Sequence, residues 1–78
     1  MTNLEKYNSS FMDTFGISSD CLPGLKYNDV PDWDSVGHMA LMTTLEDCFI
    51  IEIEIDDIIE FSGYEIGKSI LLKYGVKI

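Results

Sequence analysis

The residue types that could do chemistry in this chain are concentrated between positions 32 and 39, where the sequence is DWDSVGHM. Three kinds of site could be built from them. The first is a calcium loop, since an EF-hand takes oxygen ligands at loop positions one, three, five and twelve. Asp32 and Asp34 match the first two ligand positions. Val36 and Thr43 supply no carboxylate at the fifth and twelfth, so a calcium site is not predicted.

The second possibility is a nucleophilic triad, because Asp34, Ser35 and His38 supply its three residue types. A serine hydrolase also needs donors for the oxyanion and a cavity that encloses the acyl substrate. No glycine-rich oxyanion segment accompanies Ser35, and a chain of 78 residues is too short to enclose such a substrate. We therefore expect no enzyme here, and we interpret His38 as a helix residue at the edge of the core.

The third possibility is that Ser35 is an exposed hydroxyl at the start of a helix, which a separate enzyme modifies. The tripeptide Asp34-Ser35-Val36 resembles the Asp-Ser-Leu signature of the acyl carrier protein family, with valine in place of leucine. The second helix of that family has Leu, Leu, Glu and Phe where this chain has Leu41, Leu45, Glu46 and Phe49. Asp56 and the two helices expected after it also fall at matching distances, so the resemblance covers nearly the whole chain.

This resemblance implies that a phosphopantetheinyl transferase, using coenzyme A and magnesium, attaches 4′-phosphopantetheine to Ser35. The arm then carries an acyl or aminoacyl group as a thioester and presents it to loading and transfer enzymes. A phosphate at a helix N-terminus is favoured by free backbone N–H groups and by the helix dipole. Asp34 is expected to cap the helix and to contact the transferase. Two alternatives remain: Ser35 is only a capping serine, or the same fold is an acidic interaction module without the arm.

The exposed face of this helix is expected to recognise the partner enzymes. Gly37, Ala40 and Thr43 are neutral, whereas the common fatty-acid carriers are acidic in this region, so the resemblance is to carriers of specialised pathways. An exposed ion pair contributes only about 0–1 kcal/mol, so apolar side chains should matter more than charges. The residues expected to make partner contacts are Asp34, Val36, Met39, Met42, Glu46 and Asp47.

The charge of the chain restricts its partners further. Fourteen Asp and Glu residues stand against five Lys and Arg, giving a formal net charge of -9. Such a chain repels nucleic acids and anionic membranes, and it suits enzymes with basic surfaces. No apolar run approaches the roughly 20 residues of a membrane span, and no signal peptide is recognisable. We therefore expect a cytoplasmic monomer, in which Cys21 and Cys48 are free, partly buried thiols.

The hydrophobic pattern predicts one domain, residues 1–78, with an all-α fold: a four-helix bundle with a long loop between the first two helices. The expected helices span about residues 3–15, 34–49, 56–61 and 63–74, the third being short. Thr2 with Glu5, and Ser62 with Glu65, form capping-box patterns before the first and last helices. Gly16 and Gly75 are expected to end those helices.

Residues 50–55 are the ambiguous part of the pattern. Ile51, Ile53 and Ile55 alternate with glutamate, as in a half-buried strand. No second run of similar quality exists to pair with this segment, so we interpret it as an extended connector that inserts alternate isoleucines into the core. The core expected from the helical spacing comprises Phe11, Phe15, Leu41, Leu45, Phe49, Ile66 and Ile70.

Overall fold

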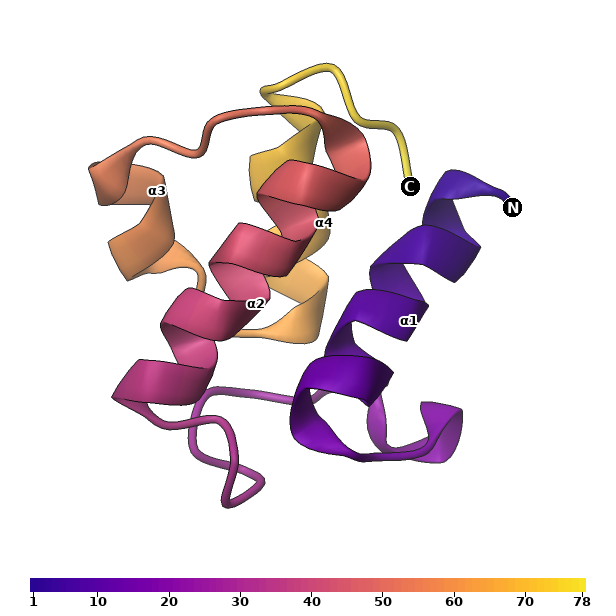
Figure 1. Cartoon of the computed structure of the whole chain (residues 1–78), viewed down its shortest axis with the longest axis vertical. Helices are drawn as coiled ribbons and strands as arrows, with labels where there is room; N and C mark the ends of the chain where they lie inside the picture. Colours follow the sequence, from indigo (N-terminus) through magenta and orange to yellow (C-terminus); the bar gives the residue numbers. More distant parts are fainter.

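The computed structural model describes all 78 residues and contains helices joined by loops, with no strand (Figure 1). The all-α class and the four α-helices predicted from the sequence are confirmed. The helices are α1 Asn3–Phe15, α2 Ser35–Phe49, α3 Ile55–Glu60 and α4 Tyr64–Leu72, with one 3₁₀ turn at Ser19–Cys21. The last helix therefore ends earlier than expected, and Gly75, with a φ of 83°, lies beyond it.

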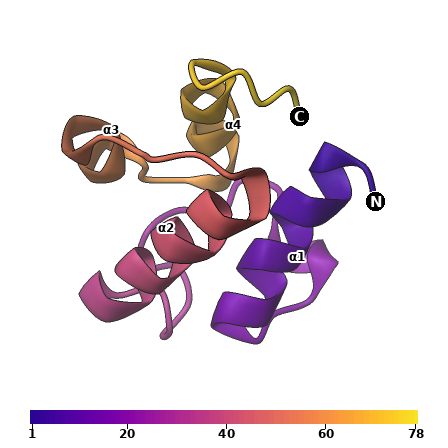
Figure 2. The same ribbon diagram turned by 45° about the horizontal axis from the view of Figure 1, so that its top comes forward.

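The helices α1 and α2 lie side by side in both views of the molecule (Figures 1 and 2). The short helix α3 lies on the side of α2 that is remote from α1, and the C-terminal segment after α4 returns towards the start of α1. There the side-chain amide of Asn3 donates a hydrogen bond of 3.0 Å to the carbonyl oxygen of Lys77. The two ends of the chain are thus held close together.

An aromatic row on α1 forms the centre of the core. Tyr7, Phe11 and Phe15 are buried and follow one another at steps of four residues, so they share one face of the helix. The ring of Phe11 packs edge-on against Tyr7 and Trp33, with centroid distances of 4.9 and 5.5 Å. Aromatic pairs of this geometry contribute about 0.5–1.5 kcal/mol beyond the area that they bury.

Two residues predicted for the core are less buried than expected: Phe49 is half-buried and packs against the core, whereas Ile66 is 44% exposed. The exposure of Ile66 follows from how closely α4 approaches its neighbours. A Cβ atom at Gly67 would overlap the hydroxyl of Tyr7 and the ring of Phe61, so this inward position must be glycine. Because Gly67 faces inward, the adjacent Ile66 faces solvent. The remaining predicted core residues, Phe11, Phe15, Leu41, Leu45 and Ile70, are buried.

The caps of α1 follow the sequence signals. The hydroxyl of Thr2 accepts a hydrogen bond of 3.1 Å from the amide of Glu5, and the Glu5 carboxylate accepts one of 2.9 Å from the amide of Thr2. This carboxylate hydrogen bonding lowers the pKa of Glu5. Gly16 ends the helix with a φ of 64°. The capping box and the C-terminal glycine are confirmed.

The start of α4 differs from the prediction. The helix begins at Tyr64, and no side chain caps it, so the expected Ser62 and Glu65 capping box is wrong. The amide of Tyr64 instead donates 2.8 Å to the carbonyl oxygen of Leu25, and the amide of Tyr27 donates 3.0 Å to that of Ser62. A long-range pairing with the first loop has taken the place of a local cap.

The connector between α2 and α3 is extended and unpaired, as predicted. Its isoleucines enter the core only in part: Ile53 is buried, Ile51 is half-buried, and Ile55 is exposed as the first residue of α3. The amide of Ile53 donates 2.8 Å to the carboxylate of Glu46. That contact ties the connector to the last turn of α2.

Ile50 ends α2 in an unfavourable backbone conformation. Its φ of 54° and ψ of 55° lie in the left-handed region, which costs an L-residue about 1–2 kcal/mol and crowds a β-branched side chain. The side chain is 91% exposed, so no burial compensates for the strain. Glycine is the usual residue at this position of a helix terminus.

Replacing Ile50 by glycine is expected to stabilise the fold by about 0.5–1 kcal/mol, because relief of the left-handed strain exceeds the added chain entropy of glycine. Ile50→Ala is the matched control, since it removes the same exposed side chain and keeps the strained backbone. Urea unfolding followed by circular dichroism measures both changes. An equal gain in the two variants would show that the backbone is not the source.

Candidate functional site

Ser35 is the first residue of α2, and its side chain is exposed. Asp34 is the N-cap. Its carboxylate accepts a hydrogen bond of 2.8 Å from the backbone amide of Gly37, and its carbonyl oxygen accepts one of 2.7 Å from the backbone amide of His38. The predicted helix start and the capping role of Asp34 are confirmed. Because Asp34 provides the cap, the hydroxyl of Ser35 is not used for it.

The first turn of α2 presents unused donors beside this hydroxyl. The amides of Ser35 and Val36 donate to no acceptor in the protein. The preceding loop packs tightly on the same turn, since a Cβ atom at Gly37 would overlap the carbonyl oxygen of Asp32. Glycine is therefore required at position 37, and the loop fixes the orientation of the turn that carries Ser35.

Trp33 connects this loop to both neighbouring helices. Its side chain is fully buried and stacks on Phe15, with the ring centroids 5.1 Å apart and the planes at 22°. Its indole nitrogen donates a hydrogen bond of 3.0 Å to Nδ1 of His38. Nε2 of His38 donates 2.7 Å to the carbonyl oxygen of Ile58 on α3. Both ring nitrogens of His38 are therefore occupied, and neither is free to act as a base towards Ser35.

A groove of about 370 Å³ opens beside Ser35, between the beginning of α2 and helix α3. It is mostly apolar. The residues that line it are Tyr27, Ser35, His38, Met39, Ile58, Ile59, Phe61 and Ser62. Neither the groove nor the contribution of α3 was predicted from the sequence. The only local signal was an apolar Ile58-Ile59 pair in a very short helix, of which Ile59 is exposed.

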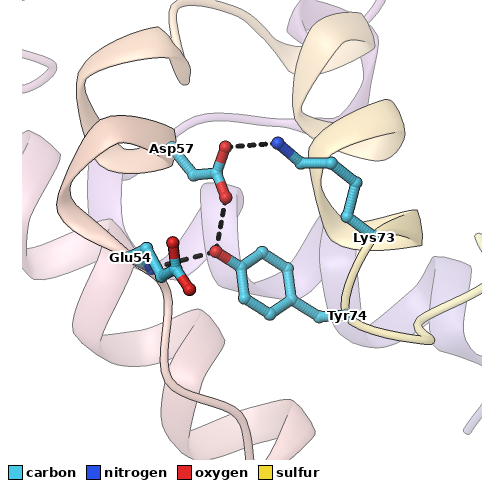
Figure 3. Close-up of polar contacts among 4 residues, drawn as sticks. All are labelled: Glu54, Asp57, Lys73 and Tyr74. Carbon is cyan, nitrogen blue, oxygen red and sulfur yellow. Dashed lines mark hydrogen bonds and ion pairs between the residues drawn. The ribbon is translucent and has the colours of Figure 1, made fainter.

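Helix α3 is held from its other side by a cluster of polar contacts centred on Asp57 (Figure 3). The carboxylate of Asp57, which is buried, accepts hydrogen bonds from Nζ of Lys73 and from the hydroxyl of Tyr74. The Tyr74 hydroxyl in turn accepts one of 2.9 Å from the amide of Glu54. We call this set of four residues the α3 clasp. It links the N-cap and the first turn of the short helix to the segment after α4.

The α3 clasp changes the ionisation of its members. The hydrogen bond from Lys73, followed by that from Tyr74, holds the pKa of Asp57 below its usual range. The same contact with Asp57 raises the pKa of Lys73. Burial raises the pKa of the Tyr74 hydroxyl, and its hydrogen bond to Asp57 adds to the effect. The clasp therefore contains a charged aspartate and a charged lysine at neutral pH.

The structure narrows the face of α2 that could meet a partner. Val36 and Met39 are 79% and 50% exposed, and the side chains of Asp34 and Asp47 are exposed as well. Met42, in contrast, is only 1% exposed. Its prediction as a partner contact is wrong, because the side of α2 that carries Leu41 and Leu45 is wide enough to bury the adjacent methionine too.

Glu46, another predicted contact, is half-buried, and its carboxylate already binds the amide of Ile53. The carboxylate of Glu46 therefore holds the connector between α2 and α3 in place. The acidic character of the region comes instead from other exposed residues, because no lysine or arginine occurs between residues 27 and 67. A partner of this face therefore meets exposed apolar side chains on helices that carry aspartate and glutamate but no lysine or arginine.

No three or more His, Cys, Asp or Glu side chains are grouped so that they could hold a metal ion. None of the helices combines the length and the apolar character needed to cross a membrane. Cys21 and Cys48 are free thiols, as predicted, although Cys21 is exposed rather than partly buried.

Compared with known proteins, the chain matches no family model, no curated protein and no solved structure. Its site must therefore be interpreted from its own geometry.

Removing the charge of Asp57 should destabilise the fold in a pH-dependent way. A folded-state pKa below the unfolded one gives stability that is complete above the ordinary value of about 3.9 and is lost as the pH falls through the folded value. Asp57→Asn should therefore lower the melting temperature at pH 7, and the difference from wild type should shrink as the pH falls below about 4.

Thermal unfolding followed by circular dichroism between pH 7 and pH 2.5 checks this expectation. Asp47→Asn is the matched control, because Asp47 is exposed and its carboxylate makes no hydrogen bond or ion pair. It should leave the melting temperature nearly unchanged at every pH. A difference for Asp57→Asn that persists undiminished at pH 2.5 would contradict the ionic account of the α3 clasp.

Proposed function

We propose that this chain is a carrier protein of the acyl carrier type, in which Ser35 is the attachment point of 4′-phosphopantetheine. The proposal rests on one observation, the exposed and unused position of the Ser35 hydroxyl at the start of α2. A serine at a helix start usually serves as the N-cap. Here Asp34 does so, and the Ser35 hydroxyl stands exposed at the first helical position, where a modifying enzyme can reach it.

The surroundings of Ser35 fit the group that it would hold. The unused amides of Ser35 and Val36, at the positive end of the α2 dipole, suit a phosphodiester. The apolar groove between α2 and α3 begins at the same residue and offers a surface to the arm or to its cargo. When bound, the group supplies the terminal thiol that forms the thioester. The protein's own residues hold and present it.

The surface supports a role in handing cargo to other proteins. The net charge of -9 and the absence of basic residues between positions 27 and 67 favour partners with basic surfaces, whose encounter rate rises with electrostatic attraction. Val36 and Met39 beside Ser35, and Ile59 across the groove, give such partners an apolar contact. The same charge opposes self-association, so the carrier acts as a monomer.

Under this proposal the chain is not itself an enzyme. The one histidine has both ring nitrogens engaged, which leaves Ser35 without a base of its own. Activation of the hydroxyl is the task of a phosphopantetheinyl transferase, with coenzyme A as the donor of the group. Since coenzyme A is an intracellular compound, the proposed site of action is the cytoplasm. A module that binds partners without the arm is the alternative, and the following experiment separates the two.

Incubation with coenzyme A, magnesium and a broad-specificity phosphopantetheinyl transferase should add one phosphopantetheinyl group to the wild type, as measured by intact mass. Ser35→Ala should gain nothing. Ser62→Ala is the matched control, because Ser62 is an exposed serine that lines the same groove. It should be modified like the wild type. If several transferases leave the wild type unmodified, the interaction module is the better account.

A further inference from the structure

Tyr27 is held in a defined position although its side chain is partly exposed. Its amide donates 3.0 Å to the carbonyl oxygen of Ser62, which fixes the backbone of the loop there. Its ring lies edge-on to Trp33 and to His38, with centroid distances of 6.2 and 5.7 Å. The ring therefore packs against Trp33 and His38 and lines the groove beside α2.

The hydroxyl of Tyr27 differs from the other tyrosine hydroxyls of the chain. Three of the four tyrosines use theirs inside the fold: Tyr7 donates to the carbonyl oxygen of Tyr64, Tyr64 donates to Asn8, and Tyr74 donates to Asp57. Tyr27 has no such partner. Its hydroxyl lies 3.4 Å from the hydroxyl of Ser35, and both residues line the same groove.

A phosphodiester on Ser35 would need neutral donors. No lysine or arginine occurs between residues 27 and 67. Two acidic residues, Asp32 and Asp34, precede Ser35 closely in the sequence. No lysine or arginine lines the groove, so a negative charge placed on Ser35 is not paired with a cation there. Neutral donors beside Ser35 include the two free amides at the start of α2 and the hydroxyl of Tyr27.

We infer that Tyr27 is a positioning residue for the group on Ser35, whose hydroxyl donates a hydrogen bond to the phosphodiester and so directs the arm along the groove. This inference rests on the carrier function proposed above. In priming, the Ser35 oxygen bonds to phosphorus, a pyrophosphate P–O bond of coenzyme A breaks, and adenosine 3′,5′-bisphosphate leaves. The serine proton passes to a base of the transferase. Tyr27 forms no covalent bond and loses no proton.

The substitution Tyr27→Phe tests the inference, because phenylalanine keeps the ring that packs on Trp33 and His38 and removes only the hydroxyl. Wild type and variant are primed with coenzyme A, magnesium and a transferase, and the ³¹P resonance of each phosphodiester is recorded. Loss of the hydrogen bond should shift this resonance. Tyr64→Phe is the matched control, since it removes a hydroxyl that bonds to Asn8 on α1, and it should leave the ³¹P resonance unchanged.

A second measurement uses the unsubstituted protein and does not depend on how the variant folds. The ring carbon that bears the Tyr27 hydroxyl should shift on priming, whereas the corresponding carbon of Tyr7 should not. Suppose the wild type is primed, but Tyr27→Phe leaves the ³¹P resonance unchanged and the Tyr27 ring carbon does not shift on priming. Tyr27 then has no positioning role, and the carrier function stands. If no transferase modifies the wild type, the carrier function fails and the inference fails with it.

Discussion

Trp33 lies at the end of the first loop with its whole side chain buried, between Phe15 of α1 and His38 of α2. Burying an indole is favourable only if its N–H finds an acceptor, and Nδ1 of His38 provides one. Because Nδ1 accepts this hydrogen bond, the ring proton of His38 is on Nε2. Nε2 then donates to the carbonyl oxygen of Ile58. The burial of one side chain thereby fixes the loop, the start of α2 and the position of α3. Two residues after it, Ser35 is exposed on a turn that cannot move independently.

The groove beside Ser35 depends on α3, and α3 cannot be stable by itself. A helix of six residues is far below the length at which isolated helices form in water. Its position comes from contacts on two sides: the hydrogen bond from His38 to Ile58, and the α3 clasp that joins Asp57 to Lys73 and Tyr74. These contacts come from α2 and from the segment after α4. The width of the groove is therefore set by residues that do not line it as well as by those that do.

Local signals in the sequence were enough to predict the helices and the position of Ser35. The capping box at Thr2 and the N-cap at Asp34 depend on neighbouring residues only, and both are present in the structure. The predictions that failed depend on distant contacts. The loop at Leu25 pairs with the start of α4 and replaces the expected cap, and Gly67 turns Ile66 outward. The burial of Met42, the hydrogen bond from Ile53 to Glu46 and the place of Tyr27 in the groove were not predicted for the same reason: helical periodicity does not report which other element lies against a residue.

If the buried indole of Trp33 holds the turn that presents Ser35, its N–H must be well protected from solvent. The chain has a single tryptophan, so its indole N–H gives one resonance in a ¹H–¹⁵N spectrum. Hydrogen exchange of that N–H in D₂O measures how firmly the anchor is held. We expect the indole N–H to exchange only through global unfolding, as slowly as the amides of Leu41 and Leu45 in the core. Exchange of the indole within the dead time, while those amides stay protected, would contradict it.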